Sequence, residues 1–217
     1  MGIVDYAVAW NLQKELVESK AAGNEERDFL ILLEHPHVIT VGRKGNMDNV
    51  LDPRVPVYRV ERGGDATYHG PGQLVAYPIV SLVRTNFALR DFVRALERII
   101  IETLSTFSIT SSAIEGKTGV WVGNKKIASI GLAVDRWITY HGLALNVNTD
   151  LAYFGMIRPC GFSAETMTSV EKITGKSLDM RRVKDSLVRA YARVMGARME
   201  AESEWRDYSI EPESLVD

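Results

Sequence analysis

Residues 62–73, RGGDATYHGPGQ, constrain the fold of this chain most strongly, because four of these twelve residues are glycine and one is proline. Glycine at this density indicates backbone with positive φ, or backbone pressed closely against another group. We expect the segment to form neither helix nor strand, and it joins two strand-like runs. Two interpretations stay open: a wide hairpin loop, or one wall of a ligand pocket with Tyr68 and His69 directed inward and Arg62 as an anchor.

The glycine-rich segment carries no nucleotide-binding motif. It lacks the G-x-G-x-x-G pattern at the start of a helix and the Lys-Ser/Thr pair of a phosphate loop. No metal site is predicted, since Cys160 has no cysteine partner and His35 and His37 stand in a strand-breaking turn without further ligands nearby. The chain also lacks the G-x-S-x-G elbow of a serine hydrolase.

The remaining pattern predicts an α+β fold in which helices flank a mixed, mostly antiparallel sheet. Asp5 is a candidate N-cap for a first helix, and Gly196 follows the last helix, near 178–195. A second amphipathic helix has its apolar stripe between Phe92 and Leu104. A tight turn at Asn124 and Lys125 predicts a hairpin. The expected strands cover 29–34, 38–42, 57–62, 73–80, 119–123, 126–134 and 137–147.

The composition indicates a single ordinary globular domain over 1–217, with an acidic and frayed C-terminal tail over about 198–217. The 26 basic and 28 acidic side chains give a net charge of −2, so nucleic acid is not the expected partner. One cysteine cannot form an internal disulfide, which fits a reducing cytosol. The longest apolar runs are far short of the ~20 residues that span a bilayer, so we expect a soluble cytoplasmic protein without membrane contact.

Cys160 and Lys126 are the candidate reactive residues. Cys160 stands between Pro159 and Gly161, which favours an accessible loop, although a lone cysteine can equally be an inert small hydrophobe. Strand alternation places Lys126 on the face opposite to Lys125. His141, in an apolar strand, is expected to be a satisfied and half-buried histidine rather than a base.

Four motifs together resemble the octanoyltransferase family that begins protein lipoylation, also called lipoate-protein ligase B. They are RGGDATYHGPGQ (62–73), GVWVGNKKIASIG (119–131), HGLALNVNTDL (141–151) and PCG (159–161), and EHPHVITVGR (34–43) supports the match more loosely. Their order and spacing cover nearly the whole domain, from about residue 29 to 170. The first motif is highly specific when it occurs beside K-I-x-S-I-G and a distal P-C-G.

The resemblance implies the fold of biotin and lipoate ligases and a two-step acyl transfer. An octanoyl group would move from the phosphopantetheine thiol of acyl carrier protein to Cys160, and then to a lysine amine. The acceptors would be lipoyl domains of 2-oxoacid dehydrogenase complexes and the glycine cleavage H protein. Lys126 would lower the pKa of the Cys160 thiol. The acyl-binding positions fall on Arg62, Gly63, Gly64, Asp65, Ala66, Thr67, Tyr68, His69, Ser129, Ile130, Gly131, Gly142, Leu143 and Ala144.

The chemistry of the residues agrees with this implied reaction. A free cysteine has a pKa near ~8.5, and a nearby ammonium stabilises the thiolate that transthioesterification needs. The donor is already a thioester, so we expect no ATP, metal or cofactor. Ile130, Leu143 and Ala144 are suitable lining for a straight eight-carbon chain. His69 either donates a hydrogen bond that positions the Lys126 or Cys160 region, or braces the loop through a backbone carbonyl.

Three alternatives remain at this point. An ATP-dependent lipoate ligase shares the fold but would not need Cys160. An amidotransferase would move lipoyl or octanoyl groups between lipoyl domains, also through a cysteine thioester. A non-catalytic acyl-binding module would not need both Cys160 and Lys126. Monomer is the expected oligomeric state.

Overall fold

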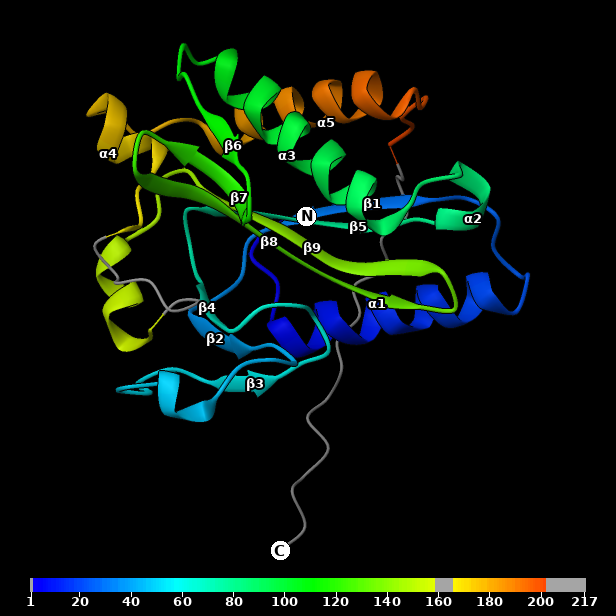
Figure 1. Cartoon of the computed structure of the whole chain (residues 1–217), viewed down its shortest axis with the longest axis horizontal. Helices are drawn as coiled ribbons and strands as arrows, with labels where there is room; N and C mark the ends of the chain where they lie inside the picture. The colour runs from blue at the N-terminus through cyan, green and yellow to red at the C-terminus, as the bar shows by residue number, and fades with distance from the viewer. Residues whose placement is uncertain (1, 159–165, 202–217) are drawn as a thin grey trace, which may run out of the picture.

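A six-stranded antiparallel sheet forms the centre of the computed structural model, which describes residues 2–158 and 166–201 (Figure 1). Its strand order is β1-β5-β9-β8-β7-β6, and every neighbouring pair is antiparallel. The strands are β1 (Phe29–Leu33), β5 (Gln73–Ile79), β6 (Ser112–Ile114), β7 (Lys117–Val122), β8 (Lys125–Asp135) and β9 (Ile138–Asn146).

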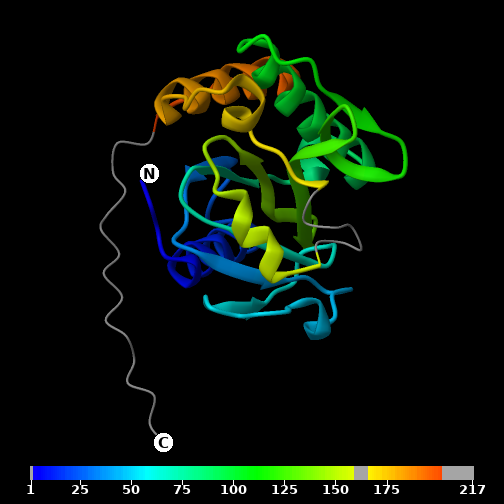
Figure 2. The same cartoon turned by 90° about the vertical axis from the view of Figure 1, so that its left-hand side faces the viewer.

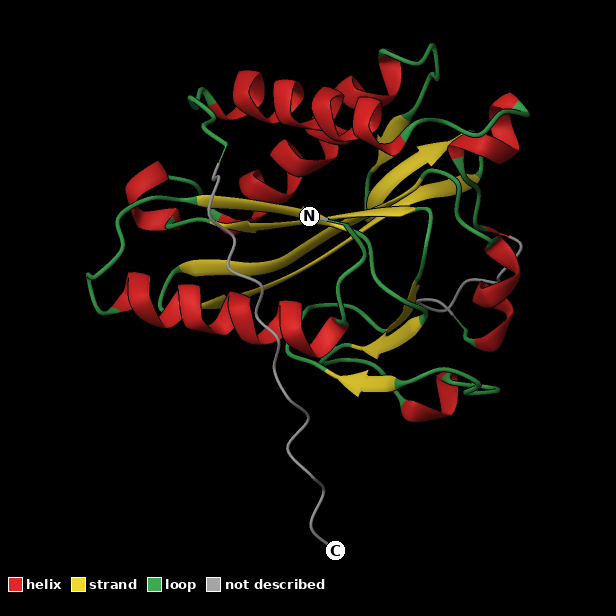
Figure 3. Ribbon diagram, turned by 180° about the vertical axis from the view of Figure 1, so that it is seen from behind, coloured by secondary structure: helices red, strands yellow, loops and turns green. Residues whose placement is uncertain are grey.

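Two amphipathic helices, α3 (Leu89–Ser105) and α5 (Met180–Met195), cover one face of this sheet, and α1 (Tyr6–Ala21) covers the other (Figures 1 and 3). The predicted stripe on α3 is confirmed, because Phe92 and Leu104 are both fully buried in the main core. The side chain of Asp5 accepts hydrogen bonds from the first turn of α1, and Gly196 ends α5 at φ 62°. Both helix boundary signals therefore act as the sequence predicts.

A second, three-stranded sheet lies on the same side of the large sheet as α1 (Figures 1 and 2). Its order is β3-β2-β4, where β2 (Val38–Val41) pairs parallel with β3 (Val57–Arg59) and antiparallel with β4 (Ala66–His69). The expectation that 62–73 contains no regular element is wrong, because its four central residues form β4. Those four residues are not glycine, and the hydrogen bonds of β2 extend them into a strand.

The predicted hairpin of β7 and β8 is present, but its turn is displaced by one residue. Gly123 and Asn124 form the turn, and Lys125 is already the first residue of β8. Gly123 has a φ of 57°, which glycine adopts without strain, so it takes the turn position. Short elements complete the fold: α2 (Leu82–Thr85), α4 (Val170–Thr174) and two 3₁₀ turns, Met47–Asn49 and Leu151–Met156.

The α+β class is thus confirmed, with a large antiparallel sheet, one parallel strand pair in the small sheet, and flanking helices. None of the helices in the described part of the chain is long and apolar enough to cross a membrane. The small sheet and α1 both adjoin the face of the large sheet where β8 and β9 meet the glycine-rich segment (Figure 1).

Candidate functional site

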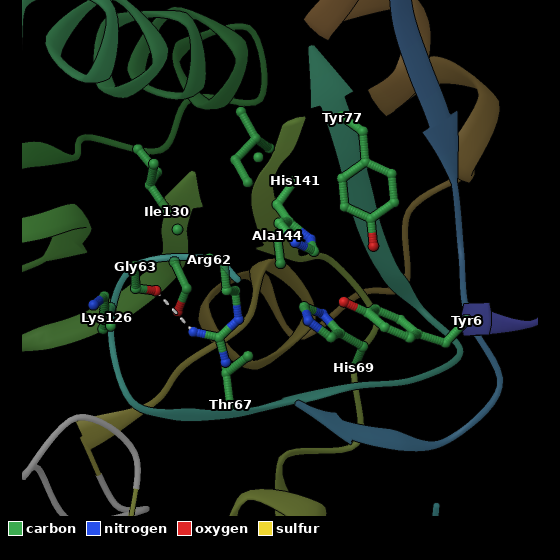
Figure 4. A pocket seen from close by; sticks show the side chains of 15 residues that line it. Tyr6, Arg62, Gly63, Thr67, His69, Tyr77, Lys126, Ile130, His141 and Ala144 are labelled. Carbon is green, nitrogen blue, oxygen red and sulfur yellow. Dashed lines mark hydrogen bonds between the residues drawn. The ribbon is translucent and has the colours of Figure 1, made fainter. Parts of the chain in front are cut away.

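A pocket lies where the glycine-rich segment and β4 meet the large sheet, and α1 contributes to its wall. Figure 4 shows Lys126 at one end and Tyr6 and Tyr77 at the other, with Arg62 and His69 between them. Its lining residues are Tyr6, Arg62, Gly63, Gly64, Thr67, His69, Tyr77, Lys126, Ser129, Ile130, Gly131, His141, Gly142, Leu143 and Ala144. Three sequence motifs that lie far apart along the chain therefore meet in one cavity.

Lys126 reaches this pocket from β8. Because successive side chains of a strand point to opposite faces of the sheet, its two neighbours point away from the pocket. The Lys126 side chain is 8% exposed and lines the pocket, whereas Lys125 is exposed and Ile127 is fully buried in the main core. The Lys126 ammonium lies 5.5 Å from the ring centre of Trp121. The sequence-based placement of Lys126 on the face opposite to Lys125 is correct.

Gly119 on β7 makes room for this lysine. A Cβ atom on Gly119 would lie 2.6 Å from Lys126 Cε and 2.5 Å from the carbonyl oxygen of Ala128. Its φ of 118° is also one that other residues rarely adopt. The Gly119 N–H donates to the side chain of Glu97 on α3, at 3.0 Å. Gly119 belongs to the motif GVWVGNKKIASIG, but its own role is visible only in the structure.

Arg62 anchors the glycine-rich segment to β2. Its guanidinium donates to the carbonyl oxygen of Thr40 at 2.7 Å, and its Nε donates to the Thr40 hydroxyl at 3.1 Å. Further hydrogen bonds run to the carbonyl oxygens of Gly63 and Asp65, at 3.0 and 2.7 Å. A single buried side chain thus fixes the path of the backbone at the pocket wall, as expected of an anchor.

Alternation along β4 divides the predicted acyl-binding run 62–69 into two groups. Thr67 and His69 face the pocket, while Ala66 and Tyr68 belong to a separate apolar cluster. Tyr68 does not point into the pocket as the sequence analysis expected, because its hydroxyl is hydrogen bonded to His37 at 2.7 Å on the other side of β4.

Asp65 also lies away from the pocket lining. One of its carboxylate oxygens accepts from Ala66 N–H at 2.7 Å, and the other accepts from the Asn49 amide at 2.5 Å. These hydrogen bonds hold the turn that leads into β4. The structure therefore brings together most of the predicted binding residues but leaves out Asp65, Ala66 and Tyr68.

The β8 and β9 positions that the sequence analysis placed in two separate motifs are direct partners across the sheet. Ser129 pairs with Ala144, Ile130 with Leu143, and Gly131 with Gly142. A Cβ atom on Gly142 would lie 2.0 Å from the carbonyl oxygen of Ala76, so glycine is required where β5 approaches β9. Ile130, Leu143 and Ala144 give this wall the apolar surface that a hydrocarbon chain favours.

His69 is buried and hydrogen bonded by the side chain of Gln73. The distance from His69 Nδ1 to Gln73 Oε1 is 2.7 Å. Burial is the main cause that lowers the pKa of His69 to about 3, and His35 lowers it further. The imidazole is therefore neutral at physiological pH. Its partner is a side-chain amide, so the structure shows no hydrogen bond from His69 to a backbone carbonyl. The alternative in which His69 donates a hydrogen bond that positions the Lys126 or Cys160 region stays a prediction.

Tyr6, Tyr77 and His141 complete the pocket, although none of them is among the residues predicted to bind the acyl group. The Tyr77 hydroxyl is hydrogen bonded to His35 Nε2 at 2.7 Å, and His35 Nδ1 donates to the carbonyl oxygen of Val4 at 2.7 Å. Tyr6 comes from α1, and its ring stacks on His69 with centroids 6.2 Å apart. No local motif marks these tyrosines, since only the packing of α1 and β5 brings them to the site.

His141 has an unusual backbone conformation, with φ 54° in the middle of β9. Its N–H donates to the side chain of the fully buried Gln13 on α1, at 2.7 Å. Its Nε2 lies 3.4 Å from a carboxylate oxygen of Glu61, and this hydrogen bond lowers the pKa of Glu61 to about 2. The expectation of a satisfied histidine is confirmed, although His141 is buried rather than half-buried and lines the pocket.

Cys160 lies outside the described residues, as do its neighbours Pro159 and Gly161, so its predicted role as nucleophile stays a prediction. The chain resumes beside the pocket. Met167, seven residues after Cys160, forms a parallel bridge with Lys126, and the Thr168 N–H donates to the Lys126 carbonyl oxygen at 2.9 Å. Within the described ranges, no group of three or more histidine, cysteine, aspartate or glutamate residues is placed to hold a metal ion.

The sequence of the chain matches known proteins along nearly all of its length. The family model for the lipoyl protein ligase A/B catalytic domain matches residues 5–192. An octanoyltransferase of Syntrophotalea carbinolica is 46% identical over 188 residues, which cover 87% of this chain and 89% of the relative. An octanoyltransferase of Syntrophobacter fumaroxidans is 40% identical over 224 aligned residues, covering 100% of this chain and 95% of the relative.

Solved structures of low sequence identity share the fold. A lipoate-protein ligase A bound with ATP superposes with a TM-score of 0.71 at 16% identity, covering 89% of this chain and 84% of that one. A lipoate protein ligase from Thermoplasma acidophilum gives a TM-score of 0.70 at 15% identity, with 93% and 85% covered. A biotin protein ligase from Aquifex aeolicus gives 0.54 at 14% identity, with 90% and 68% covered. These likenesses extend to the fold and agree with the architecture predicted from the sequence.

Proposed function

Because the chain belongs to the lipoyl protein ligase A/B catalytic domain family, we propose that it is an octanoyltransferase that works through a thioester on Cys160. The donor is octanoyl-acyl carrier protein, and the acceptor is a lysine amine of a lipoyl domain. The observation that carries the proposal is the position of Lys126, a buried amine at one end of a pocket with an apolar wall. An acyl chain fits that wall, and the lysine supplies charge at the reacting end.

The first step transfers the acyl group from one sulfur to another. The Cys160 thiolate attacks the thioester carbonyl, its new carbon–sulfur bond replaces the bond to pantetheine, and the pantetheine thiolate leaves. The ammonium of Lys126 stabilises the thiolate before the attack and can protonate the leaving sulfur. Lys126 is then a neutral amine, which is the form that the second step requires.

The second step forms the amide. The substrate lysine amine attacks the Cys160 thioester, the carbon–sulfur bond breaks, and the proton of the attacking nitrogen passes to the neutral Lys126 amine. The Cys160 thiolate and the Lys126 ammonium are thereby restored. Backbone N–H groups near the glycines can hold the oxyanion of each tetrahedral intermediate. Since the donor thioester is already activated, the reaction needs no ATP, metal ion or cofactor.

The acyl chain extends from the Lys126 end of the pocket toward Tyr6 and Tyr77. Ile130, Leu143 and Ala144 line its path, and Arg62 holds the opposite backbone in place. Several of the glycines allow the protein backbone to lie close to the methylene groups of the acyl chain. The protein is proposed to act as a cytoplasmic monomer that serves 2-oxoacid dehydrogenase lipoyl domains and the glycine cleavage H protein.

Mass spectrometry of the intact protein tests this function directly. After mixing with octanoyl-acyl carrier protein and no ATP, the protein should gain one octanoyl group that maps to Cys160, and added lipoyl domain should remove it. An ATP-dependent ligase would attach the acyl group only from the free fatty acid and only when ATP is present. That result would contradict the proposal. An amidotransferase would take the acyl group from an acylated lipoyl domain in preference to the carrier protein. A binding module would form no adduct at all.

A further inference from the structure

Three buried side chains and two main-chain carbonyl groups form a hydrogen-bond relay behind the pocket. The Asn146 amide nitrogen donates to the carbonyl oxygen of Thr168 at 3.0 Å. The Gln73 amide nitrogen donates to Asn146 Oδ1 at 2.9 Å and to the carbonyl oxygen of Tyr68 at 3.2 Å. Gln73 Oε1 faces His69 Nδ1 at 2.7 Å. Asn146 and Gln73 are 1% and 2% exposed, so water does not compete for these hydrogen bonds.

Only one orientation of the two side-chain amides gives every hydrogen bond of this relay one donor and one acceptor. The carbonyl oxygens of Thr168 and Tyr68 can accept but cannot donate, so they orient the NH₂ groups of both amides. Gln73 must then present its oxygen to His69, and His69 Nδ1 must carry the proton. Because burial keeps the imidazole neutral, Nε2 of His69 has no proton and is a hydrogen-bond acceptor.

The same relay ends beside the candidate catalytic lysine. Thr168 accepts from Asn146 through its carbonyl oxygen and donates through its N–H to the Lys126 carbonyl oxygen at 2.9 Å. Met167 adjoins Lys126 in a parallel bridge. Asn146 therefore connects the pocket imidazole to the segment that runs alongside the backbone of Lys126.

We propose that Asn146 is a positioning residue for acyl transfer, which sets the tautomer of His69 and holds residues 167–168 against Lys126. This inference rests on the proposed octanoyl transfer. With Nε2 as an acceptor, His69 offers no N–H to a substrate carbonyl oxygen in this part of the pocket. The titratable and charged groups that act on His69 are His35, Arg62 and His141, with Tyr6 stacked on its ring.

A pair of matched substitutions separates this role from a purely structural one. Asn146→Asp retains the acceptor for Gln73 and replaces the donor to Thr168 with a carboxylate oxygen. Asn148→Asp removes an equivalent donor, because Asn148 donates to the Leu178 carbonyl oxygen at 2.8 Å and accepts from the Leu178 N–H at 2.9 Å. Asn148 lies two residues further along, and its side chain bonds to Leu178 rather than to the relay.

We expect Asn146→Asp to lower kcat for octanoyl transfer about tenfold or more while KM for the carrier protein changes less than about twofold. Asn148→Asp should lower the melting temperature by about as much as Asn146→Asp does, but it should retain the wild-type kcat. Nitrogen-15 NMR of labelled histidine should show the Nδ1–H tautomer for His69 in the wild type and also in Asn146→Asp, because that variant retains the acceptor for Gln73. If Asn146→Asp does not fold, Asn146→Ser takes its place, with the same expected decrease in kcat and the same small change in KM.

Either of two kinetic results would overturn the proposal: a wild-type kcat in a folded Asn146 variant, or an equal loss of kcat in Asn148→Asp. An Nε2–H tautomer in the wild type would also do so. Failure of the proposed function is a separate outcome, because wild-type protein would then transfer no octanoyl group, whatever the tautomer of His69.

Discussion

The side chain of Lys126 lies across Gly119, where a Cβ atom would come within 2.6 Å of Lys126 Cε and 3.3 Å of its Nζ. The lysine therefore reaches the pocket over a position that lacks a side chain. Gly119 is held in turn by a hydrogen bond from its N–H to Glu97 on α3. The location of the amine thus depends on the packing between α3 and the β7–β8 hairpin.

Gly119→Ala should displace the Lys126 amine and slow acylation of Cys160 about tenfold or more, because the new methyl group occupies the space of Lys126 Cε. Gly123→Ala is the matched control, since Gly123 also has positive φ, in the turn of the same hairpin, but has open space around it. Both variants should lose about 1 kcal/mol or more of stability from backbone strain. Equal acylation rates in the two variants, measured by single-turnover mass spectrometry, would contradict this role of Gly119.

Lys126→Ala should slow acylation of Cys160 and raise the pKa of its thiol, because the ammonium that stabilises the thiolate is removed. Lys125→Ala should change neither, since Lys125 is exposed at the start of β8. Iodoacetamide alkylation rates across a pH series report the thiol pKa in each variant. If the two variants have the same alkylation profile, Lys126 is not the residue that activates the cysteine.

Cys160→Ser should abolish octanoyl transfer without unfolding the protein. The serine hydroxyl is nearly isosteric with the thiol, but a neighbouring ammonium does not ionise it at neutral pH. Octanoylation of a lipoyl domain and the melting temperature should be measured on the same preparation. Turnover close to the wild-type rate would exclude the covalent mechanism, whereas a collapsed melting transition would show that the cysteine is structural.

The stability of the protein should fall as the pH drops below about 6.5, the ordinary pKa of histidine. Burial is the main cause that lowers the pKa of His35 to about 4 and that of His69 to about 3. Between these values and about 6.5, the unfolded chain binds protons that the folded chain does not, so the free energy of unfolding decreases with decreasing pH. The loss should be on the order of 1 kcal/mol per histidine for each pH unit in that window.

Urea titrations between about pH 7 and pH 5 measure this loss. His35→Gln should be less stable at neutral pH, since it disturbs the hydrogen bonds to Tyr77 and Val4, but its stability should vary less with pH. A wild-type free energy of unfolding that stays constant over this range would show that the two histidines titrate normally in the folded protein.

The sequence predicted those features that depend on neighbouring residues. Asp5 and Gly196 mark the ends of helices through hydrogen bonds and backbone angles within one turn. The alternation at Lys125 and Lys126 is a property of any β-strand, so it placed Lys126 correctly. The same rule applies to Tyr68, but the glycine content of 62–73 predicts an irregular segment and so gives no sign of the alternation that directs Tyr68 away from the pocket.

Only the tertiary structure decided which residues enclose the pocket. Tyr6 and Tyr77 reach it because α1 packs on the face of the large sheet to which Tyr77 of β5 points, and no local pattern in the sequence reports that packing. The relay from Thr168 to His69 likewise joins residues almost a hundred positions apart. Sequence periodicity specifies the conformation and exposed face of each element, whereas the closure of a site depends on contacts between elements that are distant along the chain.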